Sequence, residues 1–321
     1  MPTKRSINAI STRPSVRMDY TVSLDSPFSL EYTLESGQLF RWERTGEWWL
    51  GVVSGGVLKV KQEGDLLRCS ASSERLGSEF VSHYFRLDVD LNHVLATLSK
   101  DETVSRAVEK FYGLRIVAQD IWECLASFVL ATNANIPRIK KMVGAICSRY
   151  GNGLEYEGEK YSAFPSPEAL AAAGESDLLA CGLGYRAPFL KRVAAAVSAG
   201  KVDFGAMASL GYAESRKLLM TELLGQKLLL GVGPKVADCV LLYACGKDEA
   251  FPIDVWIAKV IATSYPALLG PALKRRYSTE GKVKLSPSDY DRISARVRSY
   301  FGRYAGYAQQ YLFMAAREES G

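Results

Sequence analysis

The spacing of apolar residues changes once along this chain, and that change limits the folds it can adopt. Between residues 19 and about 90, apolar and polar residues alternate in short runs, at 28–34 and in parts of 39–53 and 57–69, with Gly46, Gly55-Gly56 and Gly64 between them. Such alternation is typical of half-buried strands joined by glycine turns. From about residue 89 onward, apolar residues recur at helical spacing. The sequence therefore predicts an α+β fold, with a small antiparallel β-sheet N-terminal domain followed by a multi-helix domain.

The length and the two patterns suggest a division into domains. A chain of 321 residues is long enough for two domains or three. We expect a flexible basic tail at 1–18, a β-rich domain at 19–115 and a helical domain at 116–321. Met18 is an alternative start of the protein, and the basic residues of the tail would add nonspecific affinity for DNA.

The composition excludes several kinds of functional site. The net charge of +5 permits a polyanionic partner without requiring one. Six cysteines form no CxxC pair and only two histidines are present, which argues against a metal site, an iron–sulfur cluster, a disulfide framework or His-based catalysis. No long apolar run and no secretory signal are visible. We expect an intracellular monomer (in the nucleus if eukaryotic, otherwise in the cytoplasm and nucleoid) that needs no cofactor, metal or membrane.

The most informative segment is 228–239, with the sequence LLLGVGPKVADC. Amphipathic segments at 213–224 and 236–243 flank it and predict a helix, a glycine hairpin and a second helix. Gly231 and Gly233 allow backbone shapes closed to other residues, and Pro234 suits the first turn of a helix. Amides at a helix N-terminus attract phosphate, so this hairpin could grip a DNA backbone. The alternative is a plain helical corner with a glycine cap.

Two side chains near this hairpin could carry chemistry. Lys235 opens the second helix, where partial burial and the helix end disfavour its charged form and make its amine a better nucleophile. Asp254 follows Pro252 and opens the next helical pattern, so it is a candidate N-cap. A carboxylate held by helix amides should stay ionised and could stabilise a cationic sugar. The alternatives are an exposed lysine that contacts phosphate and an aspartate that only caps.

Six ordered blocks of sequence together resemble the 8-oxoguanine DNA glycosylase/AP lyases of the helix–hairpin–helix superfamily. The resemblance covers roughly residues 28 to 313. The blocks are SGQLFRW at 36–42, NANIPR at 133–138, GLGYRA at 182–187, GVGPKVADC at 231–239, PIDV at 252–255, and YAGYAQ at 304–309 with Phe313.

The resemblance implies a role for each matching residue on a flipped nucleotide of duplex DNA that contains oxidised guanine. Lys235 would be the nucleophile and Asp254 the catalytic carboxylate. The Gly37 carbonyl would accept from N7–H of the damaged base, which guanine lacks. The base would lie between Cys239 and Phe313 and bond to Gln309, while Tyr185 would wedge the stack and Asn133, with Arg138 and Arg186, would face the orphaned cytosine.

The sequence departs from the family pattern at three positions. Ala134 replaces a second asparagine, Leu230 stands where proline is commoner, and Trp256 replaces a histidine that contacts phosphate. Two rival functions remain at this point. One is a monofunctional glycosylase of the same fold that acts on another damaged base. The other is a noncatalytic DNA-binding protein that uses only the hairpin.

Overall fold

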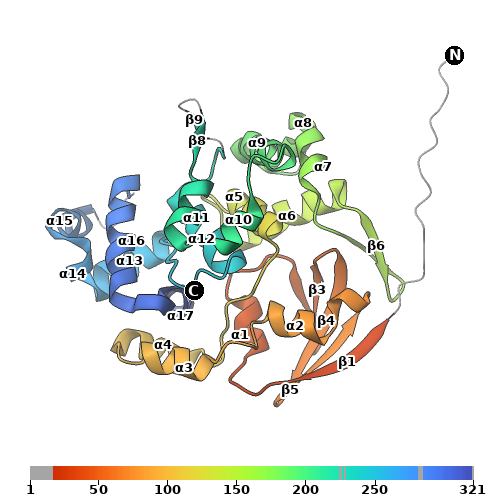
Figure 1. Ribbon diagram of the computed structural model, residues 1–321, viewed down its shortest axis with the longest axis horizontal. Coiled ribbons are helices and arrows are strands. Elements are labelled where there is room, and N and C mark those ends of the chain that lie inside the picture. The colour runs from red at the N-terminus through yellow and green to blue at the C-terminus, as the bar shows by residue number, and fades with distance from the viewer. Residues whose placement is uncertain (1–16, 224–225, 228, 281–284, 320–321) are drawn as a thin grey trace.

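The N-terminal part of the protein is a five-stranded antiparallel sheet with the order β1-β5-β4-β3-β2 (Figure 1). The computed structural model describes residues 17–223, 226–227, 229–280 and 285–319. Residues 1–16 of the expected tail lie outside this range, whereas Met18 is already the first residue of the sheet. The strands are β1 Met18–Ser23, β2 Trp42–Thr45, β3 Trp48–Val53, β4 Gly56–Glu63 and β5 Leu66–Ala71.

The turns between the consecutive strands lie where glycines predicted them. Gly46, Gly55 and Gly64 all have positive φ angles, of 63°, 76° and 59°. They join β2 to β3, β3 to β4 and β4 to β5 as antiparallel neighbours. Because a side chain strains this backbone conformation, glycine makes these tight turns possible.

The expected strand at 28–34 is wrong, because the structure forms helix α1, Leu30–Glu35, there. The Ser29 side chain caps this helix by accepting a hydrogen bond from the amide of Tyr32 at 3.2 Å. Leu30, Thr33 and Leu34 are its buried residues, a spacing of three and four that fits a helix. Alternation over seven residues did not distinguish the two structures, and the cap together with burial against the sheet favours the helix.

The rest of the chain is mainly helical, as predicted, with two short hairpins. After α2, Ser78–Tyr84, the α-helices are α3 Leu91–Leu98, α4 Glu102–Lys110, α5 Ile121–Leu130, α6 Ile136–Tyr150, α7 Pro167–Ala172, α8 Glu175–Ala180, α9 Ala187–Ser198, α10 Phe204–Ser209, α11 Tyr212–Leu219, α12 Pro234–Ala244, α13 Val255–Ser264, α14 Pro266–Leu269, α15 Pro271–Glu280, α16 Pro287–Phe301 and α17 Ala305–Glu318. The hairpins are β6 Gly153–Tyr156 with β7 Glu159–Ser162, and β8 Glu222–Leu223 with β9 Gln226–Lys227. Three 3-10 turns complete the fold: η1 Glu74–Leu76, η2 Gly184–Arg186 and η3 Gly302–Tyr304.

Among the described residues, the two largest hydrophobic cores divide the molecule. The smaller one lies between the sheet and helices α1 and α2, around Trp42, Leu58 and Leu67. The larger one surrounds α5, whose residues from Trp122 to Leu130 are buried except for Glu123. Helices α3 and α4 belong to the larger core although they precede residue 115, so packing groups them with the helical part.

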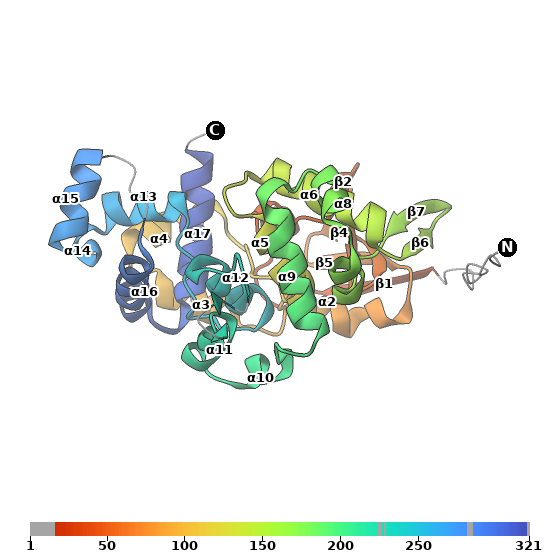
Figure 2. The ribbon, with the colours of Figure 1, turned by 90° about the horizontal axis from the view of Figure 1, so that it is seen from above.

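Helices α12 and α17 each pack against several other helices. Figure 2 shows α13 to α16 gathered at the end of the molecule opposite the β6–β7 hairpin. α12 packs against α5, while α17 packs against both α4 and α13. In the described part of the chain, no helix has the length and apolar character needed to cross a membrane.

Candidate active site

A cavity of about 690 Å³ lies where α5, α6, α12, α13 and α17 approach the loop after α1. Its lining includes Lys235, Asp254, Gly37, Asn133 and Phe313, together with Gly231 and Gly233 of the glycine hairpin. Residues separated by most of the length of the chain, from Gly37 to Phe313, therefore meet at one site. The volume falls in the range of ligand pockets and can hold a nucleobase.

The glycine hairpin leads directly into α12. Gly231 has a φ of +88°, and a Cβ there would lie 2.9 Å from Cδ2 of Phe189. Gly233 is the N-cap of α12 and Pro234 is its first residue, as predicted. The preceding helix α11 ends at Leu219, so the expected helix at 213–224 is too long. Residues 222–223 pair with 226–227 instead, and this pairing supplies their backbone hydrogen bonds.

Lys235 projects from the first turn of α12 and is partly buried. Its Nζ lies 4.9 Å from the ring centroid of Phe128 on α5. An amine over an aromatic face is in a partly dry environment and is still electrostatically stabilised as a cation. The lysine is therefore not a freely solvated surface residue, and it lies on the wall of a cavity large enough for a base.

Asp254 is the N-cap of α13, as predicted, and its Oδ1 accepts from the amide of Ile257 at 2.9 Å. Burial raises the pKa of this carboxyl above its ordinary value, while the helix amides and Lys235 oppose the rise. The prediction from sequence took account only of the helix amides, whereas desolvation acts on the pKa in the opposite direction and is the larger influence. The group is a carboxyl whose proton affinity is increased at the wall of the cavity.

Cys239 and Gln309 are buried and do not belong to the residues that line the cavity. Burial raises the pKa of the Cys239 thiol to about 11, and the nearby Lys235 opposes that rise. Gln309 Oε1 is buried without a hydrogen-bond partner among the described residues. An unsatisfied buried oxygen is costly, so it indicates a position prepared for a donor.

The loop between α1 and β2 presents Gly37 to the cavity. Side chains bond to the carbonyls of Glu35, Ser36 and Gln38, at 2.6, 2.9 and 2.8 Å respectively. Within the described part of the chain, no hydrogen bond reaches the carbonyl of Gly37. Gly37 has a φ of +80°, and a Cβ there would lie 2.9 Å from Ile136 Cδ1 and 3.2 Å from Phe313 Cε1. Only glycine fits without displacing these neighbours, and one backbone acceptor remains available.

Asn133 and Tyr185 meet at the rim of the cavity. Asn133 Nδ2 donates to the Tyr185 hydroxyl at 3.3 Å, and that hydroxyl donates to the carbonyl of Thr132 at 3.1 Å. Asn133 has a φ of +50°, and the Tyr185 ring is 51% exposed. An exposed aromatic beside a strained asparagine is available for contact with a partner.

Arg138 and Arg186, which were both predicted to lie beside the orphaned base, differ in exposure. Arg138 is exposed on the first turn of α6. Arg186 is only 1% exposed, and its guanidinium bonds to the carbonyls of Thr132 and Asn133 while lying under the Tyr185 ring. A buried arginine needs acceptors for its N–H groups, and these two backbone carbonyls provide them. Arg186 therefore holds the loop that carries Asn133.

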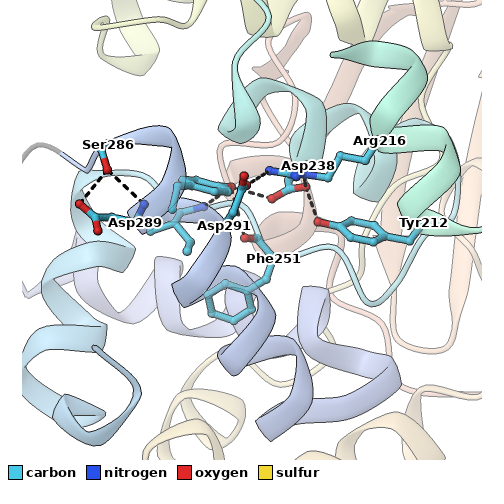
Figure 3. Close-up of polar contacts among 9 residues, drawn as sticks. Tyr212, Arg216, Asp238, Phe251, Ser286, Asp289 and Asp291 are labelled. Atoms are coloured by element: carbon cyan, nitrogen blue, oxygen red, sulfur yellow. Dashed lines mark hydrogen bonds and ion pairs between the residues drawn. The ribbon is translucent and has the colours of Figure 1, made fainter. Parts of the chain in front are cut away.

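A buried network that the sequence did not reveal connects α12 to Asp254. Asp238 is fully buried and accepts from the hydroxyl of Tyr212 at 2.7 Å and from Nε of Arg216 at 3.0 Å; Figure 3 shows these contacts. The Tyr290 hydroxyl donates to the other carboxylate oxygen of Asp238 at 2.7 Å and accepts from the amide of Ile253 at 3.1 Å. Burial raises the pKa of Asp238, and Arg216 opposes the rise.

The network links the helix of Lys235 to the backbone beside Asp254. Its one sequence signal was an aspartate within the apolar helix that follows Lys235. Tyr290 lies on α16, far along the chain, and no local pattern connects it to that helix.

Two of the three departures from the family pattern also lie at the cavity. Ala134 and Trp256 are both part of its lining. The indole of Trp256 can donate one hydrogen bond and carries no charge, unlike a histidine. No group of His, Cys, Asp or Glu side chains in the described ranges is arranged to hold a metal ion.

Known proteins resemble the chain over nearly its full length. The model of the 8-oxoguanine DNA glycosylase N-terminal domain matches residues 21–125, and that of the HhH-GPD superfamily of base excision DNA repair proteins matches 126–267. A probable N-glycosylase/DNA lyase of Methanothermobacter thermautotrophicus is 30% identical, over 90% of this chain and 94% of that protein. The N-glycosylase/DNA lyase of Saccharomyces cerevisiae is also 30% identical, over 90% of this chain and 83% of that protein.

Solved structures share the arrangement of nearly the whole chain, and one of them contains DNA with a damaged base. It is the 8-oxoguanine glycosylase/lyase of Clostridium acetobutylicum in complex with double-stranded DNA containing cytosine opposite 8-oxoguanine. It is 30% identical, with a TM-score of 0.80, over 94% of this chain and 99% of that one. Together with the lysine and the aspartate on one cavity wall, these similarities lead to one assignment. The chain belongs to the 8-oxoguanine N-glycosylase/DNA lyase family of the helix–hairpin–helix superfamily, and it is a DNA glycosylase with AP lyase activity.

Proposed function

We propose that this enzyme removes 8-oxoguanine paired with cytosine from duplex DNA, through a covalent intermediate on Lys235. The observation that carries the proposal is the geometry of the cavity. It brings a partly buried amine, a carboxyl and an available backbone carbonyl to one space that can hold a purine. The relatives described above are named as N-glycosylase/DNA lyases or as an 8-oxoguanine glycosylase/lyase, and these names support damaged DNA as the substrate.

In the first step, Lys235 in its neutral form attacks C1′ of the flipped nucleotide. The bond between C1′ and N9 breaks, and the base leaves with the electron pair and takes up a proton. The amine, positively charged after the attack, then gives up a proton. The sugar ring opens at the bond between C1′ and O4′, O4′ takes up a proton, and a Schiff base forms between Nζ and C1′. Asp254, whose charge interacts with that of Lys235, would stabilise the positive charge that develops on the sugar.

In the second step, the Schiff base makes the C2′ proton acidic. A base removes that proton, the electron pair forms the double bond between C2′ and C3′, and the bond between C3′ and its phosphate oxygen breaks. The strand is thereby cut on the 3′ side of the lesion. Water then hydrolyses the Schiff base and frees Lys235. The protein's own groups are chemically sufficient for these steps.

The cavity also suggests how the damaged base is distinguished from guanine. The carbonyl of Gly37 would accept from N7–H, a proton that guanine lacks. A single mismatched buried hydrogen bond is worth about 1–3 kcal/mol, which is useful discrimination. Phe313 of the cavity lining would contact one face of the base, and Cys239, which lies outside that lining, would contact the other. Gln309, with its unsatisfied Oε1, would bond to its Watson–Crick edge.

The rim would hold the DNA open. Gly231, Gly233 and the first turn of α12 present backbone amides to a phosphate. Asn133 would fill the space left by the flipped nucleotide, Tyr185 would enter the base stack, and Arg138 would face the orphaned cytosine. Flipping costs a few kcal/mol, and these contacts would offset part of it. Selectivity for cytosine depends on this small set, in which Ala134 contributes no polar group.

Lys235→Gln tests the proposal on duplexes that carry 8-oxoguanine opposite each of the four normal bases. The wild-type protein should release the base, nick the strand and be trapped on DNA by borohydride, and the variant should lose the trapping and the nicking. Full trapping of the variant would exclude Lys235 as the nucleophile. Base release without nicking by the wild-type protein would indicate a monofunctional glycosylase. Salt-sensitive binding without base release would indicate a noncatalytic protein.

A further inference from the structure

We propose that Gln310 is a specificity-determining positioning residue, which orients the backbone of Gly37 toward the damaged base, and that Arg317 supports it. This inference rests on the proposed function, because it assumes that the Gly37 carbonyl reads N7–H. Gln310 lies outside the lining of the cavity, so its effect on the base is indirect, whereas Arg317 belongs to that lining. Their effect depends on where they hold the loop after α1.

Gln310 is fully buried and bonds to two parts of the site at once. Its Nε2 donates to the carbonyl of Ser36 at 2.9 Å, and its Oε1 accepts from the hydroxyl of Tyr243 at 2.6 Å. The Ser36 carbonyl belongs to the peptide unit that contains the amide of Gly37. Gln310 therefore fixes the peptide plane immediately before Gly37.

Tyr243 connects this plane to the nucleophile. It lies on α12, the helix of Lys235, and its ring stacks on Phe128 with centroids 5.4 Å apart. Phe128 is also the ring over which the Lys235 amine lies. Side-chain contacts thus lead without a break from the amine to the Ser36–Gly37 peptide. The distance between the reacting group and the base-reading group is set by packing and not by a flexible loop.

Arg317 acts on the same segment from one end. Its Nη2 donates to the carbonyl of Glu35 at 2.6 Å, and its guanidinium carbon lies 5.8 Å from the centroid of the Phe313 ring. Gln310 and Arg317 are seven residues apart on α17, about two turns, so they project from one side of that helix. The helix that carries the Phe313 wall of the cavity therefore also holds the Gly37 wall.

On the other side of Gly37, the Gln38 side chain holds the chain in place. Its Nε2 donates to the carbonyl of Arg115 and its Oε1 accepts from the amide of Val117, both at 2.8 Å. With its neighbours held on both sides, a left-handed glycine has little freedom to turn its carbonyl away. Because this acceptor is already ordered before DNA binds, its ordering costs little further conformational entropy on binding.

The test compares Gln310→Met with Tyr311→Phe as a matched control. Tyr311 is the next residue on α17, is also buried, and donates to the carbonyl of Leu114 at 3.0 Å, away from the loop. Both variants lose a buried bond to a backbone carbonyl. Excision of 8-oxoguanine should fall about tenfold in Gln310→Met, the equivalent of one misaligned hydrogen bond. Nicking of a preformed abasic site, which needs no base contact, should stay at the wild-type rate in both variants.

A binding measurement reports directly on the discrimination between 8-oxoguanine and guanine. In a Lys235→Gln background, the ratio of the Kd values for duplexes with guanine and with 8-oxoguanine should fall when Gln310→Met is added and stay unchanged when Tyr311→Phe is added. Arg317→Met, at a partly exposed position, tests the same segment without opening the core and should lower the ratio in the same direction.

An unchanged ratio in Gln310→Met and Arg317→Met would overturn the inference, as would equal losses of excision and abasic nicking. A Lys235→Gln protein that shows no preference for 8-oxoguanine contradicts the role of Gly37 itself and therefore the proposed function. The two failures are thus distinguishable.

Discussion

The Tyr290 hydroxyl joins the buried carboxylate of Asp238 to the amide of Ile253, the residue before Asp254, and Tyr290→Phe removes only that atom. The substitution leaves the Ile253 amide without its partner and takes one of three donors from Asp238. Each buried group that loses its partner costs about 1–3 kcal/mol, so the free energy of unfolding should fall by about 2–4 kcal/mol. At roughly 2 cal/mol/K per residue, this corresponds to a Tm lower by about 3–6 °C.

The effect on catalysis should be larger than the loss of stability suggests. Releasing the Ile253 amide frees the backbone that sets the position of Asp254 relative to Lys235. A displacement of about 1 Å at a reacting group can cost up to a hundredfold in rate, and we expect at least a tenfold loss. The assay is single-turnover excision of 8-oxoguanine at saturating enzyme, which measures the chemical step separately from DNA binding.

Tyr212→Phe is the matched control. It removes the phenol on the other oxygen of the same carboxylate, at the same distance of 2.7 Å, but has no contact with Ile253. Its Tm should fall by a smaller amount, because Tyr212 makes one of these buried hydrogen bonds and Tyr290 makes two, while its excision rate should stay near the wild-type value. If Tyr290→Phe excised at the wild-type rate, or if both variants lost the same activity, the link between Asp238 and Asp254 would be refuted.

Three further predictions concern the cavity and its hairpin. Burial raises the pKa of Asp254 in the folded protein above its pKa in the unfolded chain. Ionisation of this carboxyl therefore lowers the stability of the fold once the pH exceeds the pKa of the unfolded chain. Asp254→Asn keeps the cap and should raise Tm at neutral pH but not near pH ~3. A lower Tm at neutral pH would contradict this sign. Trp256→His should tighten DNA binding and steepen its salt dependence below pH ~6.5, measured by fluorescence anisotropy, and unchanged salt slopes at low and high pH would count against it. Gly231→Ala should lower the free energy of unfolding by about 2–4 kcal/mol in a denaturant titration, since it combines a left-handed φ with a clash against Phe189; an unchanged midpoint would show that the turn relaxes.

Local rules are sufficient to predict several elements of the site. Pro234 at the first turn of α12 and Asp254 as the cap of α13 follow from backbone hydrogen bonding within a few residues. The glycine turns between β2 and β5 follow from the φ values that only glycine adopts easily. Where both the helix and the strand pattern fitted, as at α1, local rules were insufficient and burial decided.

Other features depended on contacts between distant segments. Arginine is a residue type that commonly contacts DNA. Arg186 is nevertheless buried under Tyr185, because backbone carbonyls of the neighbouring loop accept hydrogen bonds from its guanidinium. The pKa of Asp254 rises because neighbouring elements exclude water, which its cap position alone does not reveal. Gln310 and Ser36 are 274 positions apart, and no pattern in the chain pairs them.

The sequence by itself determined the change from a strand-rich region to a helical region, the start of α12 at Pro234 and the capping of α13 by Asp254. It could do so because dihedral preferences, caps and apolar periodicity act over a few residues. Only the tertiary structure decided which polar groups lose water, which carbonyl of the 35–38 loop stays available and which side chains connect it to α12. Solvent exclusion and close packing are properties of segments brought together by folding, and a linear pattern does not contain them.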